Sequence, residues 1–156
     1  MNIDLSDKAQ GFDGPTLVFG GVFAVANRLQ RLLDAHLPEL TSRQWWALVM
    51  LSLFDEPPTL TQLSAAMDTS HQSLKTVLNH LEKLGFVQIV PDQKDTRALR
   101  IIATEKVARW SEGAAEAQSE FMAAMFAGIS EEESLKIGQA LVKLHENLGE
   151  MESNRR

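Results

Sequence analysis

The most constraining feature of the sequence is a change of hydrophobic period within residues 59–104, from helical spacing to alternation. Thr59 and Gln62 form a capping box at the start of a short helix, because each side chain can bond the other residue's backbone N–H. After a short turn, Ser70 is a suitable N-cap for a second helix. The apolar residues of this second helix recur at three- and four-residue spacing, as Leu74, Val77, Leu78, Leu81 and Leu84.

Directly after this second helix the pattern becomes that of strands. Gly85 is suited to the left-handed conformation that ends a helix. Residues 86–90 and 99–103 then read as two β-strands, rich in β-branched residues, with a polar loop at 91–98 between them. Two helices joined by a short turn and followed by a hairpin indicate a winged helix-turn-helix.

Long amphipathic helices are expected on both sides of this region. Capping boxes open helices at Thr41 and Ser130, and Pro15 suits the first turn of another. Their apolar stripes are wider than one small core can cover, so a homodimer is the expected use of the surplus surface. The expected fold is mostly α with a small β-hairpin. Its expected parts are a flexible tail (1–14), an N-terminal dimerisation helix (15–40), a winged helix-turn-helix (41–104) and C-terminal dimerisation helices (105–156).

The charge distribution favours the middle of the chain as a nucleic-acid surface. The net charge is -6, yet residues 59–104 carry five Lys/Arg against four Asp/Glu. The start of the second helix offers hydrogen-bonding side chains and one cation but no carboxylate, as base edges and phosphates require. The hairpin loop adds cations that can reach a minor groove. The predicted DNA-binding residues are Ser70, His71, Gln72, Ser73, Lys75, Thr76, Lys94, Asp95 and Arg97.

Several segments resemble the MarR family of winged-helix transcriptional regulators. They are Leu63–Met67, Ser70–Leu74, Leu81–Val87, the Asp-x-x-Asp-x-Arg pattern of residues 92–97, and Thr104. The resemblance covers the chain from about Pro15 to its end.

The resemblance carries expectations about function. It implies that the helix at 70–84 reads the major groove, that Arg97 enters the minor groove and that Asp95 braces the loop. It also implies an obligate homodimer, typically a repressor, released by small aromatic or phenolic acids. Because a two-fold dimer places its recognition helices about 34 Å apart, the expected partner is double-stranded DNA with a pseudo-palindromic operator.

The sequence also departs from the family pattern. Family members usually carry one or two arginines where this chain has Gln88, Ile89 and Val90, and often one where Thr76 stands. Each missing arginine removes a phosphate contact and so lowers DNA affinity. The alternative is therefore a winged-helix protein-interaction module with weak or no DNA binding.

A ligand crevice is a further hypothesis. Arg28, Arg43 and Arg109 are candidate anchors for a ligand carboxylate, and Trp45, Trp46 and Trp110 are candidate walls. Each residue taken singly is more often a surface arginine or a packed tryptophan. Trp45 and Trp46 are adjacent on one helix and cannot share a face, so one of them is expected in the core.

Other functional classes find little support in the sequence. The absence of cysteine excludes disulfides, thiolate zinc sites and iron–sulfur clusters. The four histidines lack paired spacing, so neither a metal nor another cofactor is expected. No phosphate loop, Gly-x-Ser-x-Gly or His-Glu-x-x-His pattern indicates an enzyme. No signal peptide or membrane span is evident, which favours the cytoplasm.

Overall fold

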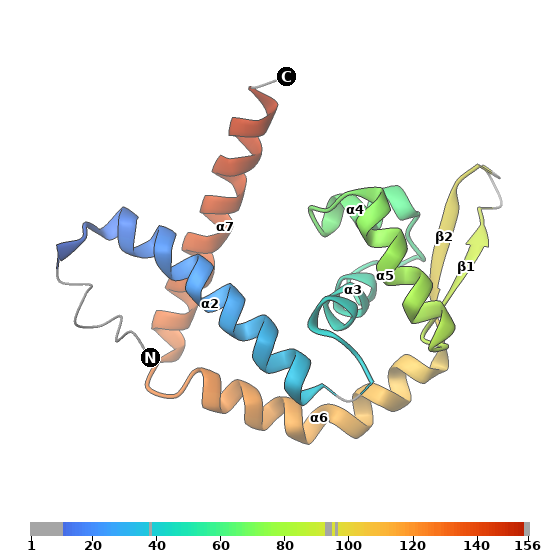
Figure 1. Ribbon diagram of the computed structural model, residues 1–156, viewed down its shortest axis with the longest axis horizontal. Helices are drawn as coiled ribbons and strands as arrows, with labels where there is room; N and C mark the ends of the chain where they lie inside the picture. The colour runs from blue at the N-terminus through green and yellow to red at the C-terminus, as the bar shows by residue number, and fades with distance from the viewer. Residues whose placement is uncertain (1–10, 38, 93–94, 96, 155–156) are drawn as a thin grey trace. The chain divides into compact units, whose positions relative to one another are not determined.

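The computed structural model describes residues 11–37, 39–92, 95 and 97–154 (Figure 1). The elements in chain order are α2 (Gly14–His36), α3 (Ser42–Ser52), α4 (Leu60–Ala66), α5 (His71–Lys83), β1 (Val87–Pro91), β2 (Leu99–Ala103), α6 (Glu105–Met125) and α7 (Glu131–Ser153). The two strands form one antiparallel hairpin. The prediction of a mostly helical chain with a small hairpin is confirmed.

The helix starts follow the capping chemistry expected from the sequence. Complete capping boxes open α3, α4 and α7, with Thr41, Thr59 and Ser130 as N-caps. At α4 the Thr59 N–H donates to Gln62 Oε1 at 2.8 Å, and the Gln62 N–H donates to Thr59 Oγ1 at 3.2 Å. These bonds satisfy backbone donors that a helix start otherwise leaves unpaired.

At α7 the same arrangement has an electrostatic consequence. Hydrogen bonds from the Ser130 side chain and then from its backbone N–H hold the pKa of Glu133 below its usual value. The carboxylate is therefore charged at the helix N-terminus, where the macrodipole favours a negative group.

The junction between α5 and the hairpin contains one correction. Gly85 has the expected positive φ of 78° and ends α5. Strand β1, however, begins at Val87 and extends through Pro91, one residue later than predicted at both ends. Phe86 is instead a fully buried connector, whose N–H donates to Leu81 O and whose carbonyl accepts the Thr104 N–H. The Phe86 side chain is buried in the core, and the strand begins only at the next residue.

Helix α3 ends at Ser52, with Leu53 as its C-cap. Helix α6 ends at Met125, and Gly128 closes the turn beyond it with a φ of 81°.

The hydrophobic core lies entirely within the winged helix. All buried apolar side chains of the described residues fall between Leu40 and Ile101, and they come from α3, α4, α5, the hairpin and the segments that join these elements. The most deeply buried are Phe86, Leu63, Leu74, Leu78, Leu81, Ile101 and Val87. This core fixes α5 against α3, α4 and β1 (Figure 1).

The chain divides into two compact units, Met1–Ala108 and Arg109–Arg156. The long helices α2, α6 and α7 contain no buried residue in the single chain. Helix α2 instead exposes Leu17, Val18, Phe19, Val22, Phe23, Val25 and Leu32, and α7 exposes Leu135, Ile137, Leu141, Val142, Leu144, Leu148 and Met151. Apolar surface of this extent is typical of an interaction face.

None of the described helices has both the length and the apolar character needed to cross a bilayer.

Candidate nucleic-acid interface

Helix α5 has one buried face and one polar, solvent-exposed face. Leu74, Leu78 and Leu81 are buried against the core. The residues predicted to contact DNA at its start, His71, Gln72, Ser73, Lys75 and Thr76, are all exposed, as is the N-cap Ser70. The hydrophobic periodicity that anchors the helix therefore also determines which side chains face outward.

The hydroxyl groups of this face are partly used by the helix itself. Ser70 Oγ accepts the Ser73 N–H at 3.2 Å and donates to Ser73 Oγ at 2.9 Å. Thr76 Oγ1 donates to the Gln72 carbonyl at 3.1 Å. The longer side chains of His71, Gln72 and Lys75 make no hydrogen bond to other described residues, which leaves them available to a partner.

The first carboxylate along α5, that of Glu82, forms a hydrogen bond within the protein. Glu82, near the C-terminal end of the helix, accepts the backbone N–H of Ile89 through Oε1 at 3.0 Å. This bond links the helix to β1. Glu82 also lies near the opposite end of α5 from the polar first turn. The start of α5 therefore presents no negative side chain to a polyanion.

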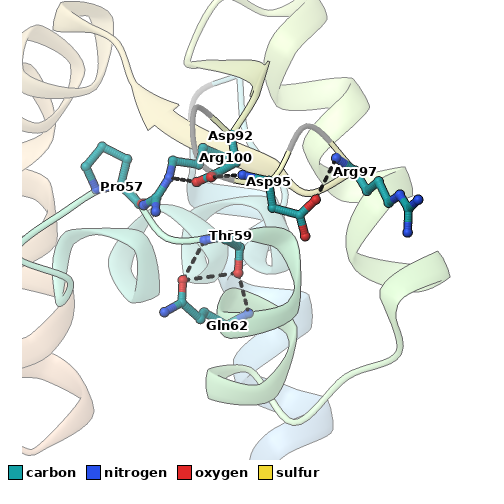
Figure 2. A network of polar contacts seen from close by, with 7 residues as sticks. All are labelled: Pro57, Thr59, Gln62, Asp92, Asp95, Arg97 and Arg100. Atoms are coloured by element: carbon teal, nitrogen blue, oxygen red, sulfur yellow. Dashed lines mark hydrogen bonds and ion pairs between the residues drawn. The ribbon is translucent and has the colours of Figure 1, made fainter.

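The loop at the tip of the hairpin, the wing, is closed by an ordered set of backbone bonds. The Asp92 N–H donates to Ala98 O at 2.9 Å, and the Ala98 N–H donates to Asp95 O at 2.8 Å. The side chain of Asp95 then accepts the Arg97 N–H at 3.0 Å (Figure 2). Arg97 is exposed. Lys94, the other predicted cation of the wing, lies outside the described residues.

The structure also reveals an interaction that sequence reasoning missed. Arg100, on β2, pairs with the buried carboxylate of Asp92 and also donates to the Pro57 carbonyl (Figure 2). In the sequence, Asp92 stands out only as part of the motif of residues 92–97, and Arg100 does not stand out. The signal in the sequence is an arginine within a strand, two residues after the wing. Its partners cannot be identified from the sequence, because they depend on the hairpin register.

The six predicted ligand-site residues are distributed over both units. Arg28 on α2 and Arg43 on α3 are exposed. The rings of Trp45 and Trp46 are 6.4 Å apart at 44°. Arg109 and Trp110, on α6, belong to the second unit.

The expectation that one of the two adjacent tryptophans is a core residue is wrong for the single chain. Trp45 is half-buried and Trp46 is 46% exposed. The inward positions of α3 are taken by smaller side chains, Ala47, Leu48 and Leu51, which fill the core beside it. The indole groups are left at its margin.

The described residues contain no cluster of three or more His, Cys, Asp or Glu side chains that could hold a metal ion.

Part of the chain is similar to a known protein family. Residues 39–98 match the model of the MarR family. A comparison with curated proteins found no match.

Solved structures share the fold over most of the chain. A MarR protein from Peptoclostridium difficile is 19% identical with a TM-score of 0.75, covering 95% of this chain and 92% of its own. A DNA complex of MepR from S. aureus is 20% identical with a TM-score of 0.73, covering 83% and 97%. BpsR from Bordetella bronchiseptica, whose DNA binding is regulated by 6-hydroxynicotinic acid, is 18% identical with a TM-score of 0.70, covering 82% and 98%.

The matched segment contains α3, α4, α5 and β1, and with them most of the hydrophobic core and the exposed face of α5. Residues 39–98 are therefore similar to the MarR family, and the chain shares the winged-helix fold of solved MarR-family structures.

Proposed function

We propose that this protein is a homodimeric, sequence-specific DNA-binding transcriptional regulator, acting as a repressor that a small aromatic or phenolic ligand releases. The observation that carries the proposal is that one rigid core presents both the carboxylate-free start of α5 and a wing that ends in an exposed arginine. Helix α5 supplies side chains for the major groove, and Arg97 supplies a cation for the minor groove.

The assigned DNA contacts follow from exposure and chemistry. Gln72 matches the paired donor and acceptor of an adenine edge, and Lys75 matches guanine or a phosphate. His71 provides a further phosphate or base contact. Ser70, Ser73 and Thr76 supply hydroxyl contacts, Lys94 adds a phosphate contact, and Asp95 braces the wing. The relative seen in complex with DNA, MepR, supports this assignment by its shared fold.

Dimerisation is proposed from the surplus apolar surface of the terminal helices. Phe19 and Phe23 on α2 are 70% and 60% exposed in the single chain, although their rings form an edge-to-face pair with centroids 5.2 Å apart. Aromatic pairs of this kind contribute strongly to protein interfaces. A second copy of the chain covers these faces and brings two α5 helices to successive major-groove positions.

Ligand release is proposed on two grounds. The similar protein BpsR has its DNA binding regulated by 6-hydroxynicotinic acid, a small aromatic acid. In this chain, exposed tryptophan and arginine side chains on α3 offer a stacking surface and an anion partner, namely Trp46 and Arg43. Arg28 and Trp45 are the other candidates within the same unit.

Two alanine substitutions test the assigned DNA surface. Arg97→Ala is expected to lower operator affinity about tenfold, because one groove contact contributes on the order of 1–3 kcal/mol. Lys75→Ala is expected to weaken binding and to reduce the slope of log K against log salt by about 1 if it neutralises a phosphate. Fluorescence anisotropy titrations at several salt concentrations measure both quantities.

Lys143→Ala is the matched control, because it removes one exposed cation from α7, outside the assigned surface. It is expected to leave operator affinity within about twofold of the original. Unchanged affinity in both Arg97→Ala and Lys75→Ala would show that the DNA surface is assigned wrongly.

A further inference from the structure

Arg100 connects two parts of the winged helix that are far apart in the sequence. Its guanidinium bonds the Asp92 carboxylate at the base of the wing and the Pro57 carbonyl in the segment that precedes α4 (Figure 2). We propose that Arg100 is a positioning residue for DNA recognition, which holds the wing so that Arg97 is presented to the minor groove in advance of binding. This inference rests on the proposed DNA-binding function.

The Asp92 carboxylate connects Arg100 to the wing. Its side chain is 5% exposed, and each of its oxygens has a separate partner. Oδ2 pairs with Arg100, whereas Oδ1 accepts the Asp95 N–H at 2.8 Å. Because a buried carboxylate requires full pairing, the orientation of Asp92 depends on Arg100.

From Asp95 the connection continues directly to the recognition arginine. Asp95 Oδ1 accepts the Arg97 N–H at 3.0 Å, and the Asp95 carbonyl accepts the Ala98 N–H at 2.8 Å. The backbone at Arg97 is therefore linked to Arg100 through two aspartates in succession (Figure 2). The side chain of Arg97 is exposed and makes no contribution to the core.

The other end of the connection is anchored next to the helix-turn-helix. The Ile101 N–H donates to Pro58 O at 3.0 Å, and Thr59 forms an antiparallel bridge with Arg100. Thr59 is also the N-cap of α4. Arg100 therefore fastens the wing to the segment in which the first helix of the helix-turn-helix begins.

This arrangement requires an arginine rather than any cation. A guanidinium offers several donors in a fixed plane, so one side chain can bond a carboxylate and a carbonyl at once. If Asp95 and Arg97 are already held in place before binding, the protein avoids part of the loss of conformational freedom that binding otherwise entails. Without Arg100, this conformational freedom is expected to be lost only on binding, which lowers the affinity for DNA.

The first test needs no DNA. In Arg100→Met, the backbone amides of Asp95 and Arg97 are expected to exchange with solvent about tenfold faster or more, since their acceptors are no longer held in place. The buried amide of Phe86, which donates to Leu81 O, serves as an internal control and is expected to stay protected. Unchanged exchange at Asp95 and Arg97 would overturn the proposal.

A second variant covers the case in which loss of the Arg100–Asp92 ion pair destabilises the whole domain. Asp92→Asn combined with Arg100→Met removes both charges of that pair. The double variant is expected to keep the Phe86 amide protected and still to show fast exchange at Asp95 and Arg97. Protection at those two amides equal to that of the original protein would contradict the role of Arg100.

The second test uses operator DNA and a double-mutant cycle on the full-length chain. Arg100→Met is expected to lower affinity about fivefold to tenfold in the original protein, but by less than about twofold in Arg97→Ala, because it acts through that residue. The slope of log K against log salt is expected to fall no further in Arg97→Ala when Arg100 is also replaced. Arg31→Met removes an exposed guanidinium from α2 and is the control.

Equal losses from Arg100→Met in both backgrounds would overturn the proposal and identify Arg100 as an independent DNA contact or a general stabiliser. Failure of the original protein to bind operator DNA would instead refute the proposed function. The amide-exchange result separates the two cases.

Discussion

Phe23→Asp is expected to convert the protein from a dimer to a monomer and to lower its operator affinity by about a hundredfold or more. The reason is that Phe23 lies on the exposed apolar face of α2, where a partner helix would bury the new carboxylate without a counter-charge. Two linked recognition helices gain affinity from effective concentration, by factors of about 10²–10⁴, and a monomer loses this gain.

Light scattering coupled to size exclusion measures the first effect, and an operator titration measures the second. The original protein is expected at twice the 17.3 kDa chain mass and the variant near the mass of one chain. Asn27→Asp adds the same charge one turn further along α2, where the side chain is already polar, and is expected to remain dimeric. A Phe23→Asp protein that is still a dimer would exclude this face of α2 from the interface.

Leu63→Ala is expected to destabilise the winged helix by about 2–5 kcal/mol, the range for truncating a fully buried leucine. Leu63 is 0% exposed and packs α4 into the core that also holds α5. The remaining cavity cannot collapse without moving helices on both sides. Thermal and denaturant unfolding, followed by circular dichroism at one protein concentration, measure the loss.

Leu53→Ala is the matched control, because Leu53 is 69% exposed at the end of α3 in the same unit. The same truncation there is expected to change the free energy of unfolding by less than about 0.5 kcal/mol. Equal destabilisation by the two substitutions would contradict the placement of the core.

Local chemistry explains why much of the fold could be predicted from the sequence. The three capping boxes and Gly85 each act within a few residues, so their patterns locate helix boundaries without knowledge of the tertiary structure. The leucine spacing of α5 likewise separates a buried face from an exposed one. The polar side chains assigned to DNA follow from that separation.

Features that depend on tertiary contacts could not be predicted in the same way. Arg100 meets Asp92 only because the hairpin register sets Pro91 opposite Leu99 and brings residues on either side of the wing together. Its bond to Pro57 spans 43 positions in the chain. The exposure of Trp46 depends on which neighbours fill the core. The adjacent positions of Trp45 and Trp46 on one helix do not determine this.

A binding and footprinting experiment with the full-length protein and the DNA upstream of its own gene, at about 50 mM salt, tests most directly whether the protein is a dimeric DNA-binding regulator. We expect a mobility shift that weakens steeply as salt is raised, and two protected major-groove segments centred about 34 Å apart. The absence of any shift at this low salt concentration would refute DNA binding and favour a winged-helix module that binds other proteins instead of DNA.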